Sequence, residues 1–322
     1  ECNNYVRQRS ASDEGEIMNP VLSIVVTAHN AERTLGRTLD SILNAISQGE
    51  DACEIVIIND ASEDGTSRIV SEFAAENFLF TRYYNVSFRN IGLVRNFAVQ
   101  HCLGDYITMV DSDDIVSGQA FFNALTLLKK EAPDVFLTRL IKVNEEDMPS
   151  PEAIVFEPKK ISREKLIRKY LAHKEVQSHF IGQFIRRELL SGICFPDFTC
   201  YEDSFTFPQV LANAEKILYS RVGFYQYLKN NNSLSNSIDA EKLGCLIEAT
   251  QKVDTLFYNA YKNLVICRWI DILVKYGDRI KDTETMILLR KRVARVSYFS
   301  FITDPGIRVS YKRKLLTLAR AR

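Results

Sequence analysis

Three carboxylates within four residues, Asp111, Asp113 and Asp114, directly follow a short apolar run from Tyr106 to Val110. Carboxylates this close repel one another, so a folded protein tolerates them best when a cation neutralises them. Hard oxygen ligands of this kind suit Mg²⁺ or Mn²⁺, and those ions in turn suit phosphates. The simpler alternative is a solvated turn whose Asp and Ser residues cap a helix that begins near Gly118. The spacing alone leaves both interpretations open.

The apolar run before the acids predicts a buried strand, so the carboxylates fall at its carboxyl end, where open α/β sheets bind ligands. Residues 21–28 and 54–60 predict two further buried strands, each followed by a helix with apolar residues at helical spacing. The third strand-and-helix repeat begins after Tyr83 and Tyr84, where a helix opens at Asn90, and the acidic strand is the fourth. Residues 135–143 form a fifth apolar segment. Strands that alternate with helices predict an α/β fold with a mostly parallel sheet flanked by helices.

Polar residues gather where these predicted strands end, which is what a ligand crevice needs. They are Thr27, His29, Asn30, Asp60, Asp111 and Asp113. Each taken singly also fits a cap or a turn. The chain has no GxGxxG after its first strand and no GxxxxGK[ST], which argues against a dinucleotide-binding fold and a P-loop NTPase.

The composition of the 322 residues is that of an ordinary globular protein, with 46% hydrophobic and 25% charged residues. Lys and Arg equal Asp and Glu at 41 each, so the overall charge gives no argument for nucleic acid binding. Seven cysteines without a CxxC favour a reducing compartment, and four histidines without HExxH argue against a zinc hydrolase. No membrane span or signal peptide is visible, so we expect a cytoplasmic protein, working at or near the inner face of the cell membrane.

Six sequence segments in order carry a resemblance to a known family. They are the strand ending in residues 27–30, then 57–66, 90–96, 104–114, 201–203 and 232–235. In this order the chain resembles the family 2 glycosyltransferases of GT-A fold, of the bacterial polysaccharide type, over residues 20–236. These are inverting enzymes that take a sugar from a nucleoside diphosphate donor.

The resemblance implies a role for each matching residue on the donor side. Thr27, Ala28, His29 and Asn30 should line the base and ribose, although the family usually has an aromatic residue at His29. Asp60 should accept a hydrogen bond from the base, commonly uracil. The family often has two acids at this place, and here the first of the two is Asn59. Arg95 should approach the nucleotide or its phosphates. Asp111, Ser112 and Asp113 form the DXD element, with Asp111 near the ribose or sugar and the metal, Mn²⁺ or Mg²⁺, held chiefly by Asp113. Asp114 should touch the donor sugar or cap the next helix.

The resemblance also implies an acceptor side and a mobile loop. Inverting transfer needs a general base for the acceptor hydroxyl, and the family's ED element makes Asp203 that base, with Glu202 as the second candidate. Without the family, two acids at a helix N-terminus are explained by the helix dipole. Lys229 and Ser233 lie in a polar loop that should close over the diphosphate, although an ordinary surface loop is an equal alternative.

The predicted domains are a polar segment at 1–19, the glycosyltransferase domain at 20–236 and a helical extension at 237–322. The final helix, 307–322, is basic and amphipathic. Such a helix fits a contact with an anionic membrane, and it equally fits a packed helix with a solvated basic face.

The leading prediction is a metal-dependent, inverting transfer from a UDP-sugar to a glycan or lipid-linked glycan, in capsule or lipopolysaccharide synthesis. A sugar-phosphate nucleotidyltransferase and a non-catalytic nucleotide- or sugar-binding module are the alternatives. The first normally has a Gly-rich loop after its first strand, and the residues from Thr27 to Arg33 contain none.

Overall fold

The computed structural model describes residues 20–320 apart from 48, 50–51, 144–157 and 229–237. These residues form two compact units. The first unit takes the chain up to 162 together with 179–197 and 213–233, and the second takes 163–178, 198–212 and the chain from 234 onward. The predicted domain boundaries at 19/20 and 236/237 involve residues outside this description.

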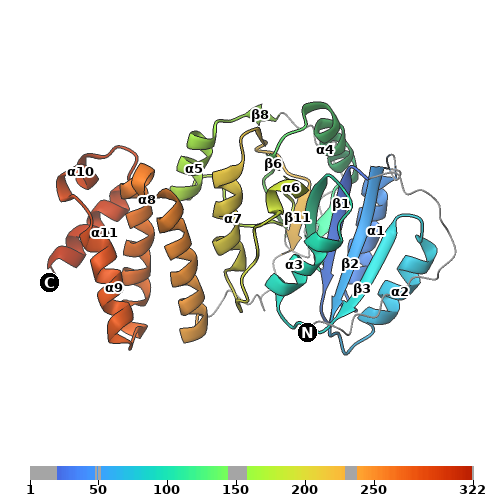
Figure 1. The fold of residues 1–322 in the computed structure, drawn as a ribbon, viewed down its shortest axis with the longest axis horizontal. Helices are drawn as coiled ribbons and strands as arrows, with labels where there is room; N and C mark the ends of the chain where they lie inside the picture. Colours follow the sequence, from blue (N-terminus) through green and yellow to red (C-terminus); the bar gives the residue numbers. More distant parts are fainter. Residues whose placement is uncertain (1–19, 48, 50–51, 144–157, 229–237, 321–322) are drawn as a thin grey trace. The chain divides into compact units, whose positions relative to one another are not determined.

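The first unit is built on an eight-stranded sheet in the order β3-β2-β1-β4-β9-β6-β10-β8. Figure 1 shows β3, β2 and β1 side by side. Its strands are β1 (Leu22–Ala28), β2 (Cys53–Asp60), β3 (Thr81–Val86), β4 (Tyr106–Asp111), β6 (Val135–Leu137), β8 (Lys159–Lys160), β9 (Phe184–Arg186) and β10 (Ile217–Tyr219). Strands β1 to β4 run parallel to one another, whereas β9 is antiparallel to both of its neighbours. Every residue of β1 and β2 is buried, which explains their continuous apolar runs.

A second, three-stranded sheet has the order β5-β11-β7, with β5 (Ile115–Val116), β7 (Ile141–Val143) and β11 (Tyr225–Leu228). Because only three residues separate the end of β4 from the start of β5, this small sheet begins directly beside the predicted ligand edge.

Helices cover the large sheet because each presents an apolar stripe to it or to a neighbouring helix. They are α1 (Leu35–Ile46), α2 (Thr66–Glu76), α3 (Ile91–His101), α4 (Gly118–Glu131) and the short α6 (Arg187–Leu190). In α1 the buried residues include Leu35, Leu39 and Ile42, one helical turn apart. The side chain of Asn90 caps α3 by accepting a hydrogen bond from the amide of Leu93.

The second unit is helical. It contains α5 (Arg163–Leu171), nearly all of α7 (Glu202–Asn213), α8 (Ala240–Tyr276), the 3₁₀ turn η3 (Gly277–Arg279), α9 (Thr283–Ala294), α10 (Tyr298–Thr303) and α11 (Val309–Arg320). Asp239 caps α8, and the helix is interrupted by non-helical backbone at Tyr261. The buried carboxylate of Asp254 accepts hydrogen bonds from Trp269 and Arg295, which ties α8 to the chain after α9.

The predicted α/β fold with a mostly parallel sheet and C-terminal helices is confirmed. One segment differs from its prediction, because residues 135–143 form two strands in two different sheets rather than one apolar element. Among the described residues, no helix combines the length and apolar character needed to cross a bilayer.

Candidate active site

The register of the parallel strands aligns the predicted ligand residues at one edge of the sheet. Thr27 in β1 pairs with Ile58 in β2 and with Asp111 in β4. Asp60 closes β2 two residues beyond that pairing. The convergence predicted for Thr27, Asp60 and Asp111 is therefore present, at the carboxyl end of three adjacent parallel strands.

The loop after β1 is tied to the loop after β2. His29 lies with Nδ1 2.6 Å from the carbonyl oxygen of Asp60, so Nδ1 carries the proton and Nε2 is left to accept from the side chain of Asn30. Asn30 adopts a positive φ of 48°. Its side-chain oxygen accepts a hydrogen bond from the backbone amide of Glu63, and its backbone amide donates to the hydroxyl of Ser62. The two loops therefore form one fixed surface at the strand ends.

Asn59, where the family often has an acid, is explained by its partners. Its amide nitrogen donates to the side-chain oxygen of Asn85, and its carbonyl oxygen accepts from Ser62. A carboxylate at this position has no proton to donate to Asn85. The departure therefore serves local hydrogen bonding between β2 and β3.

Asp60 is buried, with 6% of its surface exposed, and its carboxylate organises the next loop. One oxygen accepts the amides of Phe88 and Arg89, at 2.7 and 3.0 Å, and the other accepts the amide of Asn90 at 3.2 Å. Asp60 thus fixes the entry to α3. This role was not predicted, and the contact of Asp60 with a base stays a prediction.

The acidic cluster divides into partly exposed and buried members. Asp111, Ser112 and Asp113 are partly exposed, whereas Asp114 is fully buried. The carboxylate of Asp114 accepts the hydroxyl of Tyr225 at 2.6 Å and the amide of Leu228 at 2.9 Å. Burial, reinforced by the charge of Asp111, raises the pKa of Asp114 to about 8.

Asp114 therefore has neither of the roles that the resemblance implied. Its buried carboxylate fastens β11 to the acidic loop, and the N-cap residue of α4 is Ser117. Both alternatives were wrong because the partners of Asp114 come from β11, more than one hundred residues later in the chain, which no local pattern reveals.

Residues of α1 hold the backbone of the same loop. Thr38 donates to the carbonyl oxygens of Ser112 and Asp114, at 3.0 and 2.8 Å, and Arg37 reaches the carbonyl oxygen of Asp113 at 3.4 Å. Burial raises the pKa of Asp113, while Arg37 opposes that shift. Arg37, Thr38 and Tyr225 position the acids, and none of the three was predicted from the sequence.

Arg95 places a positive charge next to the cluster. It is buried, with 4% of its surface exposed, and its terminal nitrogen lies 3.9 Å from Oδ1 of Asp111. The guanidinium also stands over the ring of Phe195, 5.7 Å from its centroid. Arg95 and the acidic cluster are thus neighbours, whereas the approach of Arg95 to the nucleotide or its phosphates stays a prediction.

The remaining predicted residues are placed as follows. Glu202 and Asp203 form the first turn of α7 in the second unit, and both are partly exposed. Thr27 and Ala28 are buried in β1. Lys229 and Ser233 lie outside the described residues.

Comparison with known proteins decides the family. The sequence profile described as Glycosyl transferase family 2 matches residues 23–193, more than half of the chain. The chain belongs to glycosyl transferase family 2. As a member of that family it is a glycosyltransferase, and the resemblance drawn from the six segments is confirmed.

Relatives within family 2 support the assignment. Glycosyltransferase GlyA of Streptococcus pneumoniae is 24% identical over 252 residues, which cover 76% of this chain and 35% of GlyA. The poly(ribitol-phosphate) beta-glucosyltransferase of Bacillus spizizenii is 30% identical over 130 residues, covering 40% of this chain and 20% of that protein. These alignments thus span about a third and a fifth of the two relatives.

A solved structure supports the fold. Residues 1–349 of S. aureus TarS, in complex with UDP-GlcNAc, match with a TM-score of 0.67 and 17% identity. The match covers 94% of this chain and 92% of that one. At this identity the likeness establishes the shared fold.

Proposed function

We propose that this glycosyltransferase moves a sugar, with inversion, from a UDP-sugar to a glycan or lipid-linked glycan during synthesis of a surface polysaccharide. One observation carries the proposal: two partly exposed carboxylates, Asp111 and Asp113, stand with Arg95 at the carboxyl edge of a parallel sheet. TarS, of the same fold, binds UDP-GlcNAc, and a relative is named for glucosyl transfer to poly(ribitol phosphate).

The side chains at the edge fit a divalent cation. The described residues contain no group of three or more acidic, His or Cys side chains arranged to hold a metal. Two aspartates that leave coordination places for substrate oxygens match the way Mg²⁺ is bound through one or two carboxylates plus phosphates. We therefore assign Asp113 and Asp111 as the ligands of Mn²⁺ or Mg²⁺. When bound, this ion neutralises charge on the departing diphosphate.

The chain's own residues supply the remaining steps. The guanidinium of Arg95 adds a fixed positive charge on the donor side, where negative charge grows as the sugar–phosphate bond breaks. Ser112 and the surface of Thr27, Ala28, His29 and Asn30 line the nucleotide, with Asp60 accepting from the base. Lys229 and Ser233 are assigned to the diphosphate on the family resemblance alone. Asp203 accepts the proton of the attacking hydroxyl, and Glu202 supports it.

Family membership sets aside the two alternatives, the nucleotidyltransferase and the non-catalytic module. The test measures release of the nucleoside diphosphate from a panel of UDP-, GDP- and dTDP-sugars, with Mn²⁺, Mg²⁺ or a chelator. Cell-surface glycans extracted under mild conditions serve as the acceptor. We expect metal-dependent release from a UDP-sugar, faster with acceptor. Asp203→Asn should keep UDP binding and lose transfer, whereas normal transfer by this variant would refute the assigned base.

A membrane contact through the C-terminal helices is part of the proposal. Residues 285–322 contain ten Lys and Arg and a single acid, Asp304, in a chain whose net charge is zero. Phe299 and Val309, 82% and 61% exposed, add apolar surface. Such a combination suits an anionic membrane surface, where a lipid-linked acceptor resides.

Vesicle flotation tests this contact. We expect the chain to float with phosphatidylglycerol vesicles at low salt, and to float less with neutral vesicles or after Phe299→Ser combined with Arg313→Glu. Equal flotation with neutral and anionic vesicles would contradict the electrostatic part of the proposal.

A further inference from the structure

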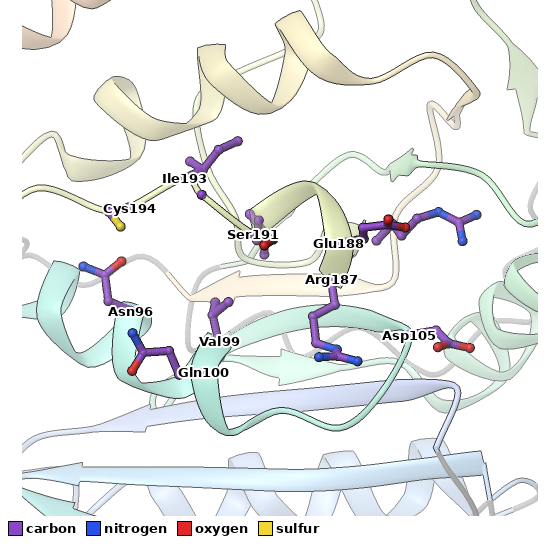
Figure 2. Close-up of a pocket in the computed structure, with 12 residues that line it drawn as sticks. Asn96, Val99, Gln100, Asp105, Arg187, Glu188, Ser191, Ile193 and Cys194 are labelled. Atoms are coloured by element: carbon purple, nitrogen blue, oxygen red, sulfur yellow. The ribbon is translucent and has the colours of Figure 1, made fainter.

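A groove of about 580 Å³ runs along α3 in the first unit (Figure 2). One wall is the face of α3 that carries Asn96, Val99 and Gln100, and the other is α6 with residues 191–194. Asp105 closes one end. It precedes β4, whereas Asp111 ends that strand, so this end lies about 20 Å along the strand from the acidic cluster.

The walls of the groove are held in place by bonds that leave other polar groups available. The amide of Asn96 bonds both the N–H and the carbonyl of Phe195, which fixes the loop after α6. The backbone amide of Arg187 donates to the backbone carbonyl oxygen of Asp105, and its Nε donates to the carbonyl oxygen of Gly104, both at 2.8 Å. Within the described part of the chain, the terminal nitrogens of Arg187 make no hydrogen bond, so they are available to a ligand.

The groups that line the groove select one class of ligand. Two arginines line the groove, Arg186 and Arg187, and two carboxylates, Asp105 and Glu188, balance their charge. Arg186 is further paired with Asp134. The groove therefore lacks the cationic excess that a diphosphate requires. Gln100 and Ser191 add an amide and a hydroxyl, while apolar surface comes from Val99, Leu190 and Ile193. Mixed donors and acceptors above short apolar patches match a neutral, hydroxyl-rich ligand, and the volume lies within the usual range for ligand sites, roughly 300–1,000 Å³.

We propose that this groove binds a neutral segment of the glycan chain, several sugars behind the end that is extended. The inference rests on the proposed function for the identity of that chain. The end of the groove opposite Asp105 adjoins the entry to α3, because Cys194, which lines the groove, continues into Phe195 and Pro196. The carbonyl of Pro196 lies so close to Gly92 that a Cβ there would meet it at 2.3 Å. A glycan lying along α3 therefore runs between the groove and the helix end that Asp60 organises.

The exposed thiol of Cys194 reports directly on occupancy, because it lines the groove. The experiment measures alkylation of Cys194 by N-ethylmaleimide, with peptide mass spectrometry, in the presence of tetrasaccharides of glucose, galactose or N-acetylglucosamine. A tetrasaccharide at twice its dissociation constant should slow the labelling about threefold, since one third of the sites stay open. Cys200, partly buried, is the internal control and should label at an unchanged rate.

Two comparisons make the result decisive. Gln100→Ala combined with Ser191→Ala should abolish most of the protection, whereas Ser71→Ala on the exposed face of α2 should preserve it. The proposal is overturned if no tetrasaccharide slows labelling of Cys194, if Cys200 is slowed equally, or if inorganic diphosphate protects as well as the sugars. Because labelling needs neither donor nor turnover, its outcome is independent of the assays of transfer.

Discussion

The hydroxyl of Tyr225 bridges two parts of the acidic loop. It donates to the buried carboxylate of Asp114 at 2.6 Å and accepts the backbone amide of Asp111 at 3.0 Å. A strand late in the chain thereby fixes the direction of the loop that presents Asp111 and Asp113. The geometry of the proposed donor site therefore depends on a residue that contacts no substrate in the account.

Tyr225→Phe should lower kcat/KM for the donor by about tenfold while the protein stays folded, because the loop loses one buried hydrogen-bonding bridge worth about 1–3 kcal/mol. Steady-state kinetics and thermal unfolding measure the two effects. Tyr298→Phe, an exposed tyrosine in α10, is the matched control and should change neither. Unchanged kinetics in Tyr225→Phe would show that the bridge does not position the acids.

Asp60→Asn should weaken UDP binding by about tenfold or more, since an amide cannot accept from all three backbone N–H groups at residues 88–90. Calorimetric titration with UDP measures the affinity, and hydrogen exchange at residues 88–90 reports the loop. Asp40→Asn on the exposed surface of α1 is the control. Faster exchange at residues 88–90 with unchanged UDP affinity would show that Asp60 has only a structural role.

The donor side of the fold was largely predictable because its signals are local. Runs of β-branched residues in β1 and β2, each ending in polar residues, predict strands and their carboxyl ends. The split of residues 135–143 was not predictable. Thr138 turns the chain there because its backbone bonds the side chain of Gln183 instead of a neighbouring strand. Like the partners of Asp114, that contact joins residues far apart in the sequence.

Glu54→Gln should lower the free energy of unfolding by about 2–4 kcal/mol, because it removes the charge of a buried ion pair. The carboxylate, 4% exposed, pairs with Arg82 and accepts from Ser23 and from the amide of Leu103. Glu72→Gln is the control, since its pair with Arg68 is exposed and worth less than about 0.5 kcal/mol. Urea unfolding of both variants compares them, and equal losses would contradict the argument.

His179 should make the fold less stable in mild acid. Burial, with a contribution from Lys142, lowers its pKa to about 4, from an ordinary value of 6.5. Between pH 6.5 and about 4 this histidine is protonated in the unfolded chain but not in the folded chain. The free energy of unfolding therefore falls as the pH drops from about 6.5 to about 4, by up to about 3 kcal/mol. His179→Gln should remove this part of the pH dependence. Parallel stability curves for variant and wild type between these pH values would refute it.

The position of manganese in a crystal grown with UDP is the sharpest test of the proposed donor site at Asp111 and Asp113. Anomalous scattering should place one Mn²⁺ at the carboxylates of Asp111 and Asp113, in contact with the diphosphate, and Asp113→Ala should lose that peak. A manganese peak elsewhere, or bound UDP whose diphosphate lies away from Asp111 and Asp113, would contradict the account.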